Sequence, residues 1–425
     1  MSGAAGLAPA LRDAARMVAR VAAGRSLADQ WSAHDAGASQ SPRAALLDLT
    51  HGTLRRYGRV QAIVATLSRR GLPDAAVQAL LWCSLYAMES GRYADYTVVD
   101  QAVRACGLLE RWTAKGYVNG LLRTWLRERP AAEARTRHDE EALHQHPAWW
   151  IELVRRAYPD AWQEVLAAGN SHPPMTLRVN RRRVEVAAYT ERLLAAGIKA
   201  QALGAEALLL ERPVPVERLP GFSAGDVSVQ DAGAQRAAGL LDLAPGQRTL
   251  DACAAPGGKA AHVLERARVA LTALDADPVR CERLGRNLQR LSLQATVRVG
   301  DCTRPDTWWD GQPFERILAD VPCTASGVAR RHPDVKWLRR STDAAAFAAR
   351  QALILSALWR VLAPGGKLLY VTCSVFPQEN DDVVGAFVAQ APHARLLPLP
   401  DGLPPQLLPG ARHDGFYYAL IQKEA

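Results

Sequence analysis

The strongest constraint on the fold is a series of five apolar, strand-like segments in the second half of the 425-residue chain. These segments are QRTLDAC, VALTALDA, ATVRVGD, FERILADVP and GKLLYVTCS, and stretches with helical periodicity separate them. Strands that alternate with helices at this spacing predict a mostly parallel sheet with helices on both faces. Such sheets bind ligands at the carboxyl ends of their strands. We therefore expect an α/β Rossmann-like domain over residues 232–425.

Two further regions precede this domain. Over residues 1–130 apolar residues recur at three- and four-residue spacing and strand signals are almost lacking, which predicts an all-helical domain. A charged connector follows, and then helical stretches alternate with two short strand candidates, MTLRVN and ALLLERP. Residues 131–231 are therefore expected to form a connector and a small α+β module.

Charge and cysteine content limit the class of protein. A formal net charge of +9 suits a polyanionic partner such as nucleic acid. The longest apolar run, at 79–88, is far shorter than the roughly 20 residues that cross a bilayer, and charged residues interrupt the N-terminal stretch. Seven scattered cysteines without a CxxC pair disfavour both a disulfide framework and a structural zinc site. We expect a cytoplasmic protein with free thiols, no membrane or metal partner, and a monomer.

The first strand of the Rossmann-like domain runs into a glycine-rich turn, DACAAPGGKAAHVLE. Gly257 and Gly258 allow the backbone to approach a ligand closely, and the following helix start presents backbone N–H groups. Asp251 stands where an acid could meet a ligand amine, although a purely structural turn explains this stretch equally well. The candidate cofactor-binding residues of this turn are Asp251, Cys253, Ala254, Ala255, Pro256, Gly257, Gly258 and Lys259.

Acidic residues also end the next two strands. Asp275 ends the second strand, where a carboxylate typically bonds a ribose diol. Asp277 is better placed as a helix N-cap, because Pro278 suits the first helical position. Asp301 follows the third strand and could reach an adenine edge. Each acid alone could be a cap or a solvated turn residue, but three in succession after a glycine loop favour a nucleoside site.

The ordered motifs DACAAPGGK, ALDAD, VGD, DVPCTASG and VTCS resemble those of RNA 5-methylcytosine methyltransferases, which use S-adenosylmethionine. The segment GVARRHPDVKWLRR resembles the RsmB (Sun, Fmu) branch, which methylates 16S ribosomal RNA. LLWCSLYAM, VVDQAV and GYVNGLLR resemble the NusB-like RNA-binding domain of that branch. The chain departs from the usual DAPCS motif at Val321 and Thr324, both of similar size to the usual residues. The resemblance implies a NusB-like domain, a small module and a class I methyltransferase domain.

The resemblance also implies catalytic roles for three residues. Cys373, in the TCS motif, would add to cytosine C6 so that C5 becomes nucleophilic. Cys323, in the PC motif, would help to release the methylated product, and Asp320 would contact either the methyl donor's amine or the cytosine edge. A disulfide between the two cysteines is the structural alternative, which a reducing compartment disfavours.

Two arginine-rich stretches flank these motifs, MTLRVNRRR and ARRHPDVKWLRR. Each alone is typical of a solvated basic face, but beside a cytosine-methylating pocket they could contact phosphates and stack on unpaired bases. The candidate RNA contacts are Arg178, Asn180, Arg330, Arg331, His332 and Lys336.

Alternative functions share parts of this pattern. A transfer-RNA cytosine methyltransferase would carry the same catalytic motifs. A non-catalytic RNA-binding or assembly factor could retain the fold, although both cysteines and the glycine loop are intact here. A DNA cytosine methyltransferase would require PCQ and ENV-like motifs, which the sequence lacks. A metalloenzyme would need a ligand cluster, whereas His332 stands alone in sequence near Cys323.

Overall fold

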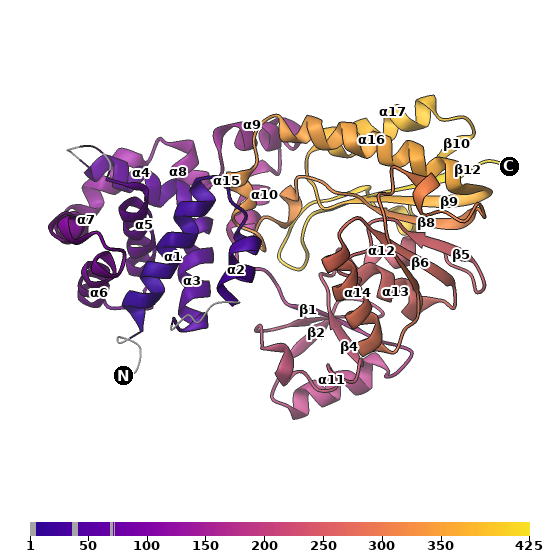
Figure 1. Ribbon diagram of the computed structural model, residues 1–425, viewed down its shortest axis with the longest axis horizontal. Helices are drawn as coiled ribbons and strands as arrows, with labels where there is room; N and C mark the ends of the chain where they lie inside the picture. Colours follow the sequence, from indigo (N-terminus) through magenta and orange to yellow (C-terminus); the bar gives the residue numbers. More distant parts are fainter. Residues whose placement is uncertain (1–5, 36–40, 69–70, 72) are drawn as a thin grey trace. The chain divides into compact units, whose positions relative to one another are not determined.

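The computed structural model describes residues 6–35, 41–68, 71 and 73–425 and divides into two compact units (Figure 1). The first unit comprises residues 1–172 and 329–341, and the second comprises residues 173–328 and 342–425. The expected module at 131–231 does not coincide with either unit. Its helical half belongs to the first unit and its strands belong to the second.

The first unit is helical throughout its described residues, as the periodicity of the sequence predicts. Its helices are α1 (Leu7–Ala22), α2 (Leu27–Asp35), α3 (Arg43–Arg55), α4 (Tyr57–Leu67), α5 (Ala75–Glu89), α6 (Asp95–Leu108), α7 (Lys115–Thr136), α8 (Glu140–His144), α9 (Ala148–Ala157), α10 (Trp162–Asn170) and α15 (Val335–Leu338). Helix α5 is apolar on nearly all sides because α1, α3, α4, α6 and α7 contact it. The carboxylate of Asp74 caps its N-terminus by accepting hydrogen bonds from the Ala76 and Val77 amides.

Helix α15 is the one helix of the first unit whose sequence lies between segments of the second unit. The Trp337 ring packs edge-on against Tyr57 with 4.9 Å between centroids, and its indole N–H donates to the Leu54 carbonyl at 2.8 Å. The Lys336 ammonium is fully buried and donates to the carbonyls of Arg55 and Gln145 and to Asn170 Oδ1, at 2.7–3.2 Å. These contacts fix the segment to the helical core.

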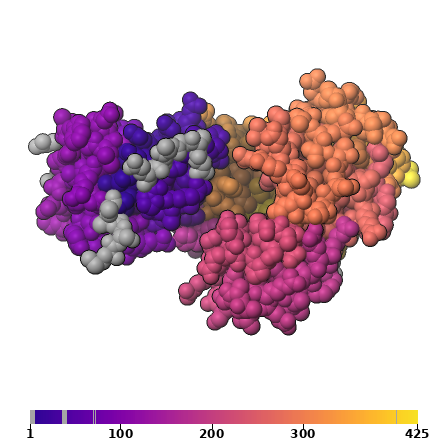
Figure 2. All heavy atoms as spheres, turned by 60° about the horizontal axis from the view of Figure 1, so that its bottom comes forward, coloured from indigo at the N-terminus to yellow at the C-terminus, as the bar shows by residue number. Residues whose placement is uncertain are grey.

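The small module of the second unit is a four-stranded antiparallel sheet in the order β2-β3-β1-β4. Its elements are β1 (Thr176–Val179), α11 (Val186–Ala195), β2 (Ala200–Ala202), β3 (Ala207–Leu210) and β4 (Val227–Val229). Leu177, Val179, Tyr189 and Leu208 form part of a separate core between the sheet and α11. In Figure 2 the magenta surface of this module adjoins the orange surface of the larger sheet domain.

The larger sheet has the order β10-β12-β9-β8-β5-β6-β7, with β11 paired to β12. Its strands are β5 (Arg248–Asp251), β6 (Ala270–Asp275), β7 (Thr296–Val299), β8 (Phe314–Asp320), β9 (Leu362–Thr372), β10 (Ala394–Leu397), β11 (Gln406–Leu407) and β12 (Phe416–Lys423). Strands β5–β9 are parallel, as expected; four of the five predicted segments contain one strand each, and the fifth, GKLLYVTCS, covers all but the first residues of β9. The antiparallel strands β10 and β12, which follow the last motif, were not expected from the sequence.

Alternate residues along the central strands enter two different cores, which is the pattern of a sheet covered on both faces. Leu318 and Leu369 pack with helices α12 (Arg236–Leu240), α13 (Gly258–Arg266) and α14 (Pro278–Leu291). Ile317 and Leu368 instead pack with α16 (Asp343–Val361) and α17 (Asp381–Gln390). The α/β class predicted from the sequence is therefore confirmed. In the part of the chain that the structure describes, no helix is long and apolar enough to cross a membrane.

The buried lysine of α15 yields a stability prediction. We expect Lys336→Ala to lower the free energy of unfolding of the helical unit by about 1–3 kcal/mol, because three buried oxygen acceptors lose their donor. Thermal or denaturant unfolding of the full chain measures this change. Lys199→Ala, at an exposed position of the small module, is the matched control and should stay within about 0.5 kcal/mol of wild type. Equal stabilities of the two variants would contradict the anchoring role.

Candidate active site

The two motif cysteines meet at the carboxyl ends of adjacent strands. Strands β8 and β9 pair in parallel, with Asp320 opposite Val371, so the residues that follow each strand leave the sheet side by side. The Sγ atoms of Cys323 and Cys373 lie 3.3 Å apart, and both are free thiols. Fold topology thus brings together two thiols that are fifty residues apart in sequence.

The two thiols occupy different environments. Cys323 is 8% exposed, whereas Cys373 is half-buried. The hydrogen bond to Cys373, followed by burial, raises the pKa of Cys323 well above its usual value. Cys323 therefore keeps its proton and can donate it toward the Cys373 sulfur. The pair is arranged as one protonated thiol beside one more accessible sulfur.

A buried carboxylate, Glu379, ties the two cysteine loops together. It ends the short 3-10 turn Pro377–Glu379 and is fully buried. Its Oε1 accepts from the Thr324 amide at 2.8 Å, and its Oε2 accepts from the hydroxyls of Thr324 and Ser374 at 2.5 and 2.6 Å. Thr324 follows Cys323 directly, and Ser374 follows Cys373 directly. One side chain therefore fixes the spacing of both loops.

Further hydrogen bonds complete this network. Gln351 of α16 donates to Glu379 at 3.3 Å and to the Pro322 carbonyl at 2.9 Å, and the hydroxyls of Ser326 and Ser374 lie 2.9 Å apart. Burial raises the pKa of Glu379, and the bonds from Ser374 and Thr324 oppose that shift. Glu379 was not among the site residues expected from the sequence. The available signal was an acid in SVFPQEN, shortly after the TCS motif, but nothing local indicated that it is buried.

The glycine-rich turn follows β5 and leads into α13. Gly257 has φ +98°, a left-handed conformation that glycine adopts without strain, and a Cβ there would lie 3.2 Å from Leu284 Cγ. The Ala255–Pro256 peptide is cis, and the Arg280 guanidinium donates to the Ala255 carbonyl at 2.6 Å. The turn thus leaves the backbone N–H groups at the start of α13 near the ends of β5 and β8.

Asp251 is fully buried at the end of β5. Neither of its carboxylate oxygens makes a hydrogen bond of ordinary geometry within the described chain. Burial, with the charge of Asp320 as the next contribution, raises the pKa of Asp251 to about 8. A buried acid without a bonded partner has the character of a group that awaits a donor from a ligand.

The other two strand-end acids hold the surrounding turns. Asp275 is buried and accepts from the Ala255 and Asp277 amides at 3.1 Å, so it joins the glycine turn to the end of β6. Asp277 caps α14 by accepting from the Val279 and Arg280 amides, which confirms the expected N-cap. Asp301 accepts from the amide and hydroxyl of Thr303, and these bonds lower its pKa.

Lys259 and Asp320 form an ion pair of 2.6 Å beside the cysteines. Burial alone would lower the pKa of Lys259. Its interactions with Asp320, and then with Cys373 and Asp251, outweigh burial, so the pKa of Lys259 lies above its usual value. Lys259 is thus a cation close to the Cys373 sulfur, to the half-buried Asp320 and to the buried Asp251. This arrangement gives a defined position to a residue that the sequence placed only in the glycine loop.

A second pair of thiols lies behind the glycine turn. The Sγ atoms of Cys253 and Cys302 are 3.9 Å apart, and Cys302 is buried. The interaction with Cys302, followed by burial, raises the pKa of Cys253 well above its usual value. The two sulfurs contact each other inside the domain, which is a packing role for both thiols.

The structure corrects the expected RNA contacts of the β1 stretch. Arg178 is 1% exposed and makes a two-pronged ion pair with Glu265 at 2.8 Å, and it also donates to the Gly258 carbonyl. Asn180 is equally buried and donates to the Gly225 carbonyl at 3.1 Å. Arg178 thus joins the small module to α13, whereas Asn180 holds a turn within the module, so both side chains are used inside the protein.

The second arginine-rich stretch is corrected in part. Lys336 is used to anchor α15, and Arg330 is 2% exposed, so neither side chain presents its charge at a surface. Arg331 is half-buried and His332 is exposed, and both lie in the same segment of the first unit. Of the six candidate contacts, four are therefore buried.

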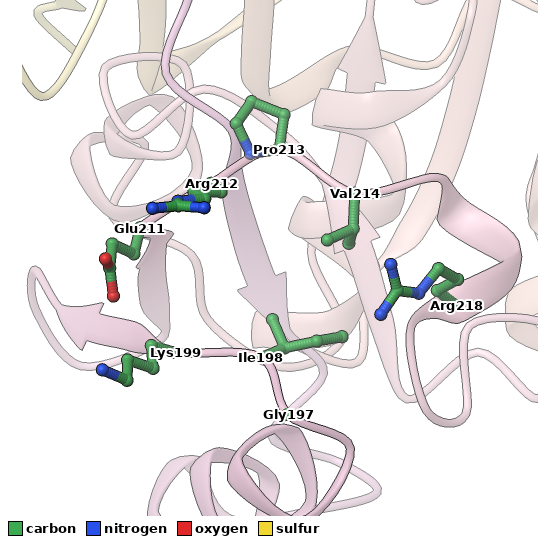
Figure 3. A pocket seen from close by; sticks show the side chains of 8 residues that line it. All are labelled: Gly197, Ile198, Lys199, Glu211, Arg212, Pro213, Val214 and Arg218. Atoms are coloured by element: carbon green, nitrogen blue, oxygen red, sulfur yellow. The ribbon is translucent and has the colours of Figure 1, made fainter. Parts of the chain in front are cut away.

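A separate surface pocket of about 390 Å³ lies in the small module, between the end of α11 and the chain that follows β3 (Figure 3). Lys199, Arg212 and Arg218 lie around it, together with Glu211. It contains none of the motif residues, so it is not the candidate active site. Within the described residues, no group of three or more metal-ligating side chains occurs.

Comparison with known proteins supports this architecture region by region. The family described as 16S rRNA methyltransferase RsmB/F matches residues 238–422, the ferredoxin-like domain of RsmF/B-like methyltransferases matches residues 146–217, and the NusB family matches residues 10–127. Among solved structures, "PH0851" covers 98% of this chain at 22% identity with a TM-score of 0.81, which shows a common fold. A methyltransferase homologue from Pyrococcus horikoshii covers 67% of the chain, at 26% identity and a TM-score of 0.60.

Sequence relatives extend over almost the entire chain. Ribosomal RNA small subunit methyltransferase B of Vibrio cholerae is 41% identical over 408 residues, which is 94% of each chain. The protein of the same description from Pseudomonas putida is 42% identical over 428 residues, which is 97% of this chain and 98% of the relative. The chain therefore belongs to the family of ribosomal RNA small subunit methyltransferase B.

Proposed function

We propose that this enzyme transfers a methyl group from S-adenosylmethionine to C5 of one cytosine in 16S ribosomal RNA, with Cys373 as the nucleophile. The observation that carries the proposal is the contact between Cys323 and Cys373 at the carboxyl ends of β8 and β9. Two free thiols at 3.3 Å, only one of them well shielded from solvent, suit a reaction in which a sulfur adds to a ring and later leaves it.

The residues at the ends of β5, β6 and β7 fit S-adenosylmethionine. Asp251 is a buried acid whose carboxylate oxygens make no hydrogen bond of ordinary geometry within the described residues, and it would hold the amino group. The open backbone at Gly257 and Gly258 would admit the ligand closely, since a Cβ at Gly258 would meet only Gln230 at 3.8 Å. Asp275 and Asp301 would take the ribose and adenine edges. When bound, S-adenosylmethionine supplies an electrophilic methyl group on its sulfonium.

Cytosine C5 is a weak nucleophile, and a bond between Cys373 and the neighbouring C6 would make C5 more nucleophilic. Addition of the Cys373 thiolate to C6 forms a carbon–sulfur bond and places electron density on C5, which can then take the methyl group. Loss of the C5 proton and cleavage of the carbon–sulfur bond restore the aromatic ring and release the thiolate. Lys259 lies close to Cys373 and stabilises negative charge on that sulfur.

Cys323 would exchange a proton during the reaction, and Asp320 would contact a ligand group. Cys323 remains protonated and in contact with Cys373, so it can exchange a proton during product release. Asp320, held by Lys259, can meet either the amine of the methyl donor or the N3/N4 edge of cytosine. Because the target base must reach Cys373, an unpaired cytosine is favoured over one in a stable duplex.

Two alternatives remain distinguishable by experiment. A transfer-RNA cytosine methyltransferase would use the same cysteines, but the relatives that match nearly the full length are described as ribosomal RNA enzymes. A non-catalytic binding factor would not need two free thiols in contact at adjacent strand ends. The intact catalytic constellation favours an enzyme.

Trapping the covalent intermediate tests the proposal. We expect Cys323→Ala, expressed in cells and purified under denaturing conditions, to carry RNA bound to Cys373 at one cytosine of 16S ribosomal RNA. The reason is that the adduct forms normally while its resolution is impaired. Sequencing of the attached RNA identifies the nucleotide, and the Cys323→Ala/Cys373→Ala variant is the control that should carry none.

The other outcomes of this experiment have clear meanings. Transfer RNA attached to Cys373 would contradict 16S ribosomal RNA as the substrate but would support the covalent mechanism. If no adduct forms and the purified wild-type protein transfers no methyl group to ribosomal RNA, the binding-factor alternative replaces the proposal.

The position of Glu379 gives a second prediction. Glu379→Gln places an amide N–H₂ against hydroxyl and amide donors, so both cysteine loops should shift relative to each other. We expect kcat to fall about 10–100-fold while KM for S-adenosylmethionine changes little, because misplacement of the thiols affects the chemical step. Asp382→Asn, the same chemical change at an exposed position of α17, should be neutral. If Glu379→Gln lowered the stability of the protein but left kcat unchanged, Glu379 would have a packing role and would not position the thiols.

The buried acid gives a pH prediction. With a pKa of about 8, Asp251 holds a proton in the free enzyme at pH 7 and must lose it to pair with a ligand ammonium. Affinity for S-adenosylmethionine should therefore rise from pH 6 to 8 by up to about tenfold per pH unit. Titration calorimetry in buffers of different ionisation heat should detect the released proton. Asp251→Asn should bind more weakly and without this dependence, and a pH-independent wild type would contradict the assignment.

A further inference from the structure

An arginine-lined cavity of about 570 Å³ lies entirely within the first unit. It is formed where the α3–α4 junction meets the turn after α5, helix α7 and the end of α10. Its basic residues come from these separate elements, and none belongs to the motifs that the proposed mechanism uses. They are Arg55, Arg56, Arg59, Arg92, Arg129 and His172.

The carboxylates around this cavity are too few to neutralise it. Glu89 pairs with Arg56 at 3.4 Å and with Arg59 at 3.0 Å. Glu133 pairs with Arg59 and Arg129, and Asp48 pairs with Arg92. Five guanidinium groups thus share three carboxylates, and two positive charges remain.

Arg55 has the least compensation of the five. Its guanidinium donates to the Arg330 backbone carbonyl at 3.0 Å, and its buried Nε has no hydrogen-bond partner within the described residues. Burial lowers the pKa of Arg55. Burial also lowers the pKa of His172, and the charges of Arg55 and Arg92 lower it further. The cavity is therefore electropositive at its base as well as at its rim.

The rim is accessible to a large partner. The side chains of Arg56, Arg92 and Arg129 are 46%, 56% and 48% exposed. Guanidinium groups bind phosphate oxygens in a two-pronged geometry, and several of them around one hollow match a folded phosphate backbone better than a single anionic side chain. Phosphate contacts position an RNA without reading its sequence.

We propose that this cavity binds backbone phosphates of the ribosomal RNA substrate, away from the cytosine that is methylated. The inference rests on the proposed function for the identity of the RNA, but its location rests on the cavity alone. It also differs from the expected RNA contacts at Arg178 and Lys336, whose charges are consumed inside the protein.

The test uses the full-length protein and transcribed 16S ribosomal RNA. We expect Arg56→Gln/Arg92→Gln to weaken RNA binding about tenfold or more at moderate salt, because two charge-assisted contacts are lost. The slope of log affinity against log salt should fall by about 1–2, since roughly one counterion is released per phosphate contact. Arg104→Gln, an exposed arginine of α6 that pairs with Asp100 and does not line the cavity, is the matched control and should leave both quantities unchanged.

Separate measurements keep this inference apart from the proposed function. Unchanged affinity for S-adenosylmethionine and an unchanged melting transition would show that the variant is folded. Suppose that wild type methylates ribosomal RNA but the double variant keeps the RNA affinity and salt slope of wild type. The RNA-binding role of the cavity would then be wrong, and the proposed function would still hold. A variant that binds naked RNA normally but binds a small-subunit assembly particle weakly would assign the cavity to a protein instead and would also overturn the inference. Failure of wild type to methylate any ribosomal RNA would overturn the function itself.

Discussion

The active site depends on the parallel pairing of β8 with β9. Because the two strands run side by side in register, the loops that follow them emerge at the same edge, and Cys323 meets Cys373 there. Glu379 then holds both loops through the residue that follows each cysteine. A buried carboxylate is costly to desolvate, so its position between the two cysteine loops is easier to explain by the geometry it imposes than by stability.

Around this pair the enzyme concentrates charge in a small volume. In the part of the chain that the structure describes, Asp251 is buried and makes no hydrogen bond of ordinary geometry through its carboxylate, whereas Asp320 pairs with Lys259 at 2.6 Å. Burial raises the pKa of Asp251, which allows this acid to respond to an incoming ammonium. By our inference, the arginines that bind phosphate belong to the helical unit, around a cavity where guanidinium groups outnumber carboxylates.

Much of the fold was predictable because local periodicity carries it. The five parallel strands, the helical first region and the Asp277 cap follow from patterns within a few residues of each element. The strand-end motifs also indicated which thiols and acids could form a site. Strands β10 and β12 were missed, because they follow the motifs and are paired antiparallel through contacts that no local pattern specifies.

The sequence alone indicated the type of chemistry, because its ordered motifs resemble those of RNA 5-methylcytosine methyltransferases and stand at the ends of predicted strands. Only the tertiary structure decided which charged residues remain available to a ligand. Arg178 and Lys336 lie in basic stretches whose composition predicts RNA contacts. In the structure Arg178 forms an ion pair with Glu265, and Lys336 donates hydrogen bonds to three oxygen acceptors. Glu379 acquired its role in the same way. Burial and pairing depend on partners tens to hundreds of residues away, and only folding brings those partners together.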